Sequence, residues 1–263
     1  MRQSLKAFLA CAALACLPAR AATPFSVDAS DLWFNPAEQG WGVNIAQQGD
    51  TVFLTLYVYG SDNKPVWYVA SSMAGARTGG VGDVRFVGDL FSTTGPAFSA
   101  AAFDPSKVVA TRVGSATLDI AGGTQGTLTY SVNGAVVTKK IVRQTWRENN
   151  ASGGYIGYLQ GSCATTTTGP EESMTFTINQ AVPSFSMNTA GASGVSCGYT
   201  GTYSQDGRLG HAEGNFSCSN GKSGTFSLDA IEASTDGIVT HLTTKVGSCT
   251  LTSRLAGIRR GTS

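Results

Sequence analysis

Closely spaced turn signals constrain this chain more than any other feature of its sequence. In the second half Asp206-Gly207, Asn220-Gly221 and Asp236-Gly237 follow one another at intervals that leave room for a single strand each. The first half carries Asn133-Gly134, a strong hairpin signal. Between the turns the apolar residues alternate with a period of two, which is typical of strands.

No segment has the periodicity of an amphipathic helix, and only residues 105–109 are expected to form a single helical turn. The sequence therefore predicts an all-β protein made of two antiparallel meander domains. Each is expected to be a small β-barrel or a sandwich. Barrels are favoured because closure removes sheet edges that would otherwise pair with other chains.

The N-terminus has the pattern of a secretory signal peptide over residues 1–21. Arg2 and Lys6 precede the apolar run 7–17, and the small-residue site 19–21 follows. The protein is therefore expected to be exported to the periplasm or the exterior. A lipoprotein anchored through Cys16 is a minor alternative.

The exported chain keeps four of the six cysteines: Cys163, Cys197, Cys218 and Cys249. An even number in an oxidising compartment predicts two disulfides, both in the second domain. Three connectivities are open. Pairing of Cys197 with Cys218 is preferred because a turn at 206–207 would bring them close to register, and pairing of the first and last strands would bring Cys163 toward Cys249.

The domain boundary is placed at a polar, glycine-rich stretch. This gives an aromatic-rich β domain over 22–147, a linker over 148–154 and a disulfide-bearing β domain over 155–263. Both domains end in a similar apolar and basic strand, at 141–147 and 255–260.

The balance of charge excludes one class of partner. The full chain has 18 basic and 17 acidic residues, and loss of the signal peptide would leave 15 and 17, a net charge of −2. Nucleic acid binding needs clustered Lys and Arg, so no nucleic acid partner is expected. No later stretch is apolar enough to be a transmembrane segment.

Motifs for catalysis are missing from the sequence. His211 and His241 are the two histidines, and the His211-Ala212-Glu213 fragment resembles part of a deaminase zinc motif without the cysteines that should follow. There is no G-x-S-x-G elbow and no calcium-loop run. We expect no catalytic residue, no metal and no cofactor, and an enzyme is left open only through a carboxylate pair drawn from Glu38, Asp50 and Asp62.

Residues 52–59 are apolar or aromatic on both faces of the strand. Val52, Leu54, Leu56 and Val58 share one face, and Phe53, Tyr57 and Tyr59 lie on the other with Thr55. A strand of this kind is predicted to be covered on both sides.

Large aromatics gather in the first hairpins and give the sharpest functional hypothesis. Cross-strand pairing should bring several together. Rings stack on sugars and amides fix their orientation, so a ligand site is one interpretation; the core of a small barrel is the other, and it is favoured. The candidate ligand-binding residues are Trp33, Asn35, Glu38, Trp41, Asn44, Phe53, Tyr57, Tyr59 and Trp67.

The segment from Trp33 to Asn44, Trp-Phe-Asn-Pro-x-Glu-x-Gly-Trp-Gly-Val-Asn, together with Pro65-Val66-Trp67, resembles a signature of uncharacterised secreted proteobacterial β-rich proteins. The second half, with Cys197-Gly198-Tyr199 and Cys218, is similar to the same proteins. The resemblance implies export and β architecture. It implies no activity.

Three functions of different class follow. The first is a non-enzymatic binding or adhesion module whose partner is a glycan, another small amphipathic molecule or an extracellular protein. The second is an inhibitor of a secreted hydrolase, acting through a loop near 92–100. The third, least favoured, is a carboxylate-dependent hydrolase.

Overall fold

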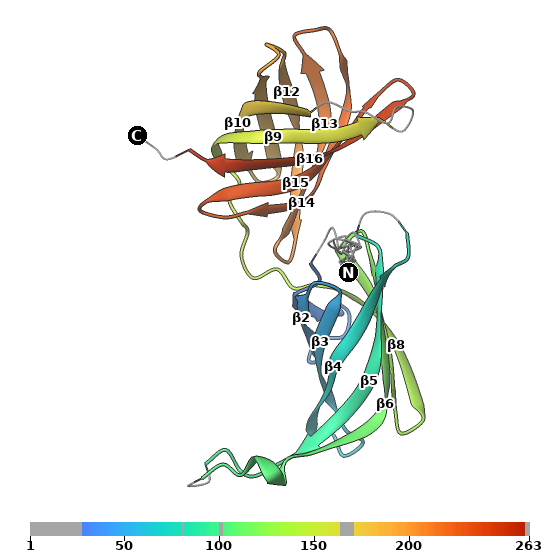
Figure 1. Cartoon of the computed structure of the whole chain (residues 1–263). Helices are drawn as coiled ribbons and strands as arrows, with labels where there is room; N and C mark the ends of the chain where they lie inside the picture. The colour runs from blue at the N-terminus through green and yellow to red at the C-terminus, as the bar shows by residue number, and fades with distance from the viewer. Residues whose placement is uncertain (1–27, 80–81, 100–101, 164–170, 261–263) are drawn as a thin grey trace, which may run out of the picture.

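The computed structural model describes residues 28–79, 82–99, 102–163 and 171–260. It contains two closed antiparallel barrels of eight strands each, joined end to end in the chain (Figure 1). The predicted all-β class and the two meander barrels are confirmed. The proposed signal peptide and Cys16 lie outside the described residues.

The first barrel is a meander in which every strand pairs with its neighbours in the chain. A 3-10 turn at Pro105–Lys107, within the range expected for a helical turn, lies between its fifth and sixth strands. The strands are β1 Asp31–Phe34, β2 Gly42–Gln48, β3 Thr51–Tyr59, β4 Pro65–Arg77, β5 Val84–Thr94, β6 Val109–Ala121, β7 Gln125–Val132 and β8 Ala135–Arg143.

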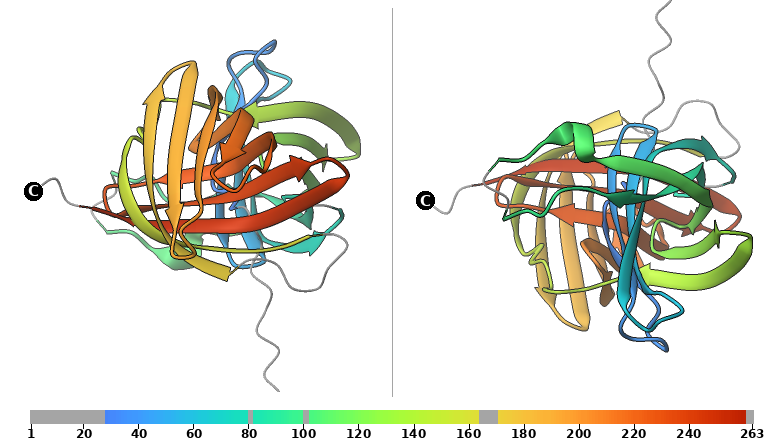
Figure 2. Two further views of the ribbon diagram at one scale, coloured as in Figure 1. Left: turned by 90° about the horizontal axis from the view of Figure 1, so that it is seen from above. Right: turned by 90° about the horizontal axis from the view of Figure 1, so that it is seen from below.

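The second barrel has the same order of pairing, and its first and last strands close it as expected from the sequence. In the left view of Figure 2, from above, its yellow and orange strands run across its red strands. The strands are β9 Gly153–Cys163, β10 Glu171–Ala181, β11 Ser184–Gly191, β12 Ser196–Asp206, β13 Leu209–Cys218, β14 Ser223–Ala233, β15 Gly237–Val246 and β16 Cys249–Arg259.

The β7–β8 hairpin shows how local chemistry sets this topology. Val132 pairs with Ala135, which leaves Asn133 and Gly134 as a two-residue turn. Both have positive φ, 50° and 89°. This is the geometry of a type I′ turn, which matches the twist of the flanking strands and strongly prefers Asn-Gly.

Side chains fill the interiors of both barrels. The first core is largely aliphatic, and Val52, Leu54 and Leu56 of β3 point into it with no exposed surface. The second core is richer in aromatic rings, with Tyr155 stacked on Phe176 at 4.9 Å between centroids. Small barrels of eight strands are commonly filled in this way.

Both barrels have an arginine stacked on an aromatic ring where the first and last strands meet, and we call this pair the closing device. Trp33 of β1 lies opposite Arg143 of β8, and Tyr155 of β9 lies opposite Arg259 of β16. Each guanidinium lies over its ring, at 4.7 Å and 5.1 Å from the centroid. Each ring donates a hydrogen bond to the carbonyl of an alanine four residues earlier in the chain. The two basic strand ends seen in the sequence are therefore equivalent in structure.

The turn between β12 and β13 contacts the first barrel at β1 and at the segment that follows β8. The backbone N–H of Gly207 donates to Thr145 Oγ1 at 2.8 Å, and that of Arg208 donates to Asp31 Oδ2 at 3.2 Å. Gly207 has φ +59°, and a Cβ there would lie 2.3 Å from Asp31 Oδ2. Glycine is required here both for its backbone conformation and for space.

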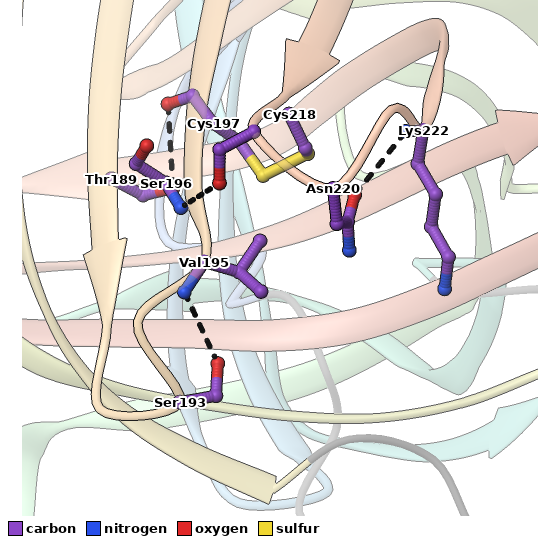
Figure 3. Close-up of a disulfide and its surroundings, with 9 residues drawn as sticks. Thr189, Ser193, Val195, Ser196, Cys197, Cys218, Asn220 and Lys222 are labelled. Carbon is purple, nitrogen blue, oxygen red and sulfur yellow. Dashed lines mark hydrogen bonds between the residues drawn. A yellow bond between two sulfur atoms is a disulfide. The ribbon is translucent and has the colours of Figure 1, made fainter.

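A disulfide joins Cys197 of β12 to Cys218 of β13, which lie directly opposite each other (Figure 3). This predicted bridge is confirmed. The other predicted bridge, between Cys163 and Cys249, involves a side chain outside the described residues and stays a prediction.

Candidate functional site

Aromatic side chains cover the outer face of β3. Phe53, Tyr57 and Tyr59 alternate with the buried aliphatic positions and are 44%, 46% and 60% exposed. The prediction that this strand is covered on both faces is therefore wrong. A closed barrel buries only the inward half of each strand, and a second layer would be needed to cover the other half.

Trp67 of β4 extends this surface. It lies directly opposite Tyr57 and is 50% exposed. We call Phe53, Tyr57, Tyr59 and Trp67 the aromatic platform. Aromatic side chains opposed across neighbouring strands are close enough to interact, so Tyr57 and Trp67 can contribute to one apolar surface.

The neighbours of the platform on β2 are small or polar. Ala46 lies opposite Phe53 and Gly42 opposite Tyr57, while Asn44 lies opposite Thr55 between them. Small neighbours leave the ring faces uncovered. The exposed amide of Asn44 lies within the same surface and can donate and accept hydrogen bonds.

The loop between β1 and β2 reaches the end of the platform at Tyr59. Gly40 there has φ +112°, and a Cβ at this position would lie 3.6 Å from Tyr59 Oη. The backbone conformation favours glycine, which explains one of the glycines of the aromatic segment.

Glu38 and Trp41, from the β1–β2 loop, contact Lys139 of β8. The Trp41 indole N–H donates to Glu38 Oε2 at 3.1 Å, and Lys139 Nζ lies 2.7 Å from the same oxygen. Trp41 is half-buried and packs against the first core. The hydrogen bond from Lys139 lowers the pKa of Glu38, so the carboxylate stays ionised near neutral pH. A lowered pKa does not suit a general acid, which needs a raised one.

The remaining candidates have local structural roles. Trp33 is fully buried beneath Arg143 and belongs to the core, so it presents no surface to a ligand. Asn35 accepts a hydrogen bond from the backbone N–H of Ala37 and so stabilises its own turn. Asp50 and Asp62 also lie in turns, where Asp62 accepts from the N–H of Lys64.

His211 belongs to a polar network on the outside of the second barrel. Its Nδ1 lies 2.8 Å from Asp229 Oδ1, whereas its Nε2 lies 3.6 Å from Glu213 Oε2. Asp229 also accepts from Ser227 Oγ. The main partner of His211 is thus a residue on the next strand and not Glu213 on its own strand.

Neither a metal-ligand cluster nor a membrane-spanning helix occurs in the part of the chain that the structure describes. No group of three or more His, Cys, Asp and Glu side chains is placed to hold a metal ion. Within the same residues, no helix has the length and apolarity needed to span a membrane.

Comparisons with known proteins identify no family and no function for the chain. No family model and no curated protein matches the chain. Among solved structures, the chain is similar to a protein of Bacteroides fragilis NCTC 9343 described as a "putative outer membrane protein", at 16% sequence identity with a TM-score of 0.33. The match covers 84% of this chain and 95% of that chain. The function must therefore be inferred from the residues themselves.

Proposed function

We propose that this protein is a non-enzymatic binding module of the periplasm or the exterior, and that its aromatic platform binds a glycan. The observation that carries the proposal is the outward orientation of four large aromatics on two adjacent strands, each between 44% and 60% exposed. Contiguous exposed apolar surface on a soluble domain commonly marks an interaction site. The Cys197–Cys218 disulfide and the resemblance to secreted proteobacterial proteins support export.

The chemistry of the platform suits a neutral sugar chain. Aromatic rings stack on the apolar faces of sugar rings, and the tips of Tyr57, Tyr59 and Trp67 can hydrogen-bond to hydroxyl groups. Asn44 and Thr55 add polar groups between the rings. The residues opposite the platform rings on β2 and β4, including Ala46 and Pro65, carry no charge, so an ionic ligand would find no partner among them.

The shape of the platform favours an extended ligand over a single sugar. Phe53 and Tyr59 are six residues apart on one strand, which corresponds to about 20 Å at a rise of about 3.3 Å per residue. A ligand lying along β3 could contact several rings in succession. We therefore expect affinity to increase with the length of the oligosaccharide.

The test is a titration of the exported chain with peptidoglycan fragments and with chito- and cello-oligosaccharides of increasing length, followed by calorimetry. Trp67→Ala and Tyr57→Ala should each weaken binding by at least about tenfold, the loss of about 1.4 kcal/mol. Trp146→Ala is the matched control, because Trp146 is 76% exposed and lies outside the platform.

Because Trp67 is half exposed, its removal should destabilise the barrel by only about 1 kcal/mol, well below the 3–5 kcal/mol of a buried tryptophan. Failure of every oligosaccharide to bind would refute the proposal. Equal binding by the Trp67→Ala and Trp146→Ala variants would refute the platform as the site.

One observation favours the alternative function, inhibition of a secreted hydrolase. The ends of β5 and β6 extend beyond the first barrel as an arm that carries the 3-10 turn (Figure 1). Near its tip Phe98 is fully exposed and Phe103 is 61% exposed. A protruding apolar side chain can fill a substrate pocket. Loss of inhibition of lysozymes or periplasmic proteases in a Phe98→Ala variant would support this function, and absence of inhibition by the wild type would exclude it.

A further inference from the structure

A second exposed apolar surface lies on the outer wall of the other barrel. Neighbouring residues of β9, β15 and β16 face outward there: Ile258 is opposite Ile156, and Ala256 is opposite both Tyr158 and Val239. Ile258 is 75% exposed, Ile156 57% and Tyr158 45%. We call these five residues the apolar strip.

The strip is the floor of a groove of about 1310 Å³. Asp28, which precedes β1, and Asn149, between the two barrels, also line the groove. Arg208 of the β12–β13 turn lies at the same end, where its guanidinium is 2.9 Å from Asp28. The second barrel therefore supplies most of the lining, and the segment before β1 and the link between the barrels border the groove at one end.

An arginine and a histidine lie at the next outward-facing position along β15 and β16. His241 of β15 and Arg254 of β16 are directly opposite each other, and both line the groove. Among the described residues Arg254 has no carboxylate within 4 Å, whereas Arg208 at the other end is paired with Asp28. The Nδ1 atom of His241 is shielded from solvent and has no hydrogen-bond partner in the described structure.

The other groups that face these two side chains are already engaged. Asp229, opposite His241 on β14, accepts hydrogen bonds from His211 and Ser227. Gln160, opposite Arg254 on β9, donates to Glu171. Arg254 thus remains available to an anion that enters the groove, whereas His241 Nδ1 becomes accessible to the anion only if the imidazole ring turns. A buried polar atom without a partner is uncommon and calls for one.

We propose that this groove binds a long-chain carboxylate, with its alkyl chain on the apolar strip and its carboxylate at Arg254 and His241. The strip supplies apolar area to bury, and Arg254 supplies an unpaired positive charge at one end, whereas Arg208 and Asp28 at the other end are paired with each other. An acid with a single unbranched tail has the same division of polarity along its length. The site is separate from the aromatic platform, so it neither requires nor excludes glycan binding.

Calorimetric titration of the full exported chain with decanoate tests the proposal, with butyrate and decanol as probes that lack the tail and the charge respectively. Decanoate should bind with a stoichiometry of one, and both other probes at least about tenfold more weakly. Arg254→Gln and Ile258→Ser should each weaken decanoate binding by about tenfold.

Lys140→Gln and Val136→Ser are matched controls on the outside of the first barrel, where Lys140 is exposed and Val136 is 69% exposed. Both should leave decanoate binding unchanged. Trp67→Ala should also leave it unchanged, which separates this site from the aromatic platform. Circular dichroism of each variant shows whether the second barrel is folded. If Ile258→Ser unfolds the barrel, Val239→Thr takes its place in the test.

Several results would overturn the proposal. The proposed carboxylate site is refuted if decanoate does not bind. It is also refuted if decanoate binds equally to the Arg254→Gln and Lys140→Gln variants. Equal affinity for decanol shows that the charge is not recognised. Binding to phosphatidylglycerol vesicles without binding to free decanoate would make the strip a membrane contact instead.

Discussion

Replacing Arg143 by methionine tests the closing device of the first barrel. The Arg143 side chain is fully buried, and its three nitrogens donate to the carbonyls of Gly123, Asp28 and Ser30 and to Asp31 Oδ2. Burial lowers the pKa of Arg143, although Asp31 raises it. The guanidinium therefore depends on these acceptors to compensate for the loss of water.

The magnitude follows from the acceptors left behind. Methionine keeps much of the volume and the contact with Trp33 but donates no hydrogen bond. Removing one partner of a buried ion pair costs about 3–5 kcal/mol, the unpaired acceptors included, so we expect about 4 kcal/mol in total.

Arg259→Met is the matched comparison in the second barrel. Arg259 also lies over an aromatic ring and donates to the carbonyls of Ser152, Asn150 and Ser234. It is only half-buried and has no carboxylate in this set, so water can satisfy most of these acceptors in the variant. The expected cost is about 1–2 kcal/mol.

Urea unfolding followed by two probes separates the barrels. All four tryptophans, Trp33, Trp41, Trp67 and Trp146, belong to the first barrel or follow it directly, so tryptophan fluorescence monitors that barrel. Far-ultraviolet circular dichroism monitors both. Arg143→Met should lower the free energy of unfolding in the fluorescence transition, and Arg259→Met should leave that transition unchanged. The reasoning is refuted if Arg143→Met costs less than about 1 kcal/mol, or if Arg259→Met costs as much.

Two further results are expected. Replacing both Cys197 and Cys218 by alanine removes a cross-link between residues 21 positions apart and should destabilise the second barrel by about 3 kcal/mol. Urea unfolding should show this as an earlier transition in circular dichroism, while the transition in tryptophan fluorescence stays unchanged. An unchanged dichroism transition would contradict the expectation. The hydrogen bond to Asp229 raises the pKa of His211, so its contribution to stability is complete below the unfolded pKa of about 6.5 and is lost as the pH rises through the higher folded pKa. A His211→Gln variant should lack this decrease in the urea midpoint above about pH 6.5, and a decrease equal to that of the wild type would show that another group causes it.

Features set by adjacent residues could be predicted from the sequence. The Asn133-Gly134 turn follows from the backbone conformations that these two residues tolerate. The Cys197–Cys218 bridge follows from the same logic, because a turn at 206–207 fixes which residues of β12 and β13 lie opposite each other. The β10–β11 hairpin has no such signal, since its turn is the Val182-Pro183 pair, and those strands were not predicted.

Features set by distant residues could not be predicted. Lys139 is 101 residues from Glu38, so their ion pair exists only because the β1–β2 loop and β8 meet in the barrel. Alternation along β3 separates two faces correctly, but it does not say whether a second layer covers the aromatic one. Whether a second layer is present depends on the rest of the molecule. Its absence over this face leaves Tyr57 and Trp67 on the surface and not in a core.

The filled interiors determine where either barrel can bind a ligand. Leu54, Leu118 and Leu128 in the first barrel and Met187 and Leu228 in the second have no exposed surface, and removing such side chains to admit a ligand would cost about 2–5 kcal/mol each. The ends near Trp33 and Tyr155 are also occupied, by the arginines that lie over them. The outer walls carry no such constraint, because an outward position can change without disturbing the core. Recognition by this protein should therefore map to outward-facing residues of the strands, where the aromatic platform and the apolar strip both lie.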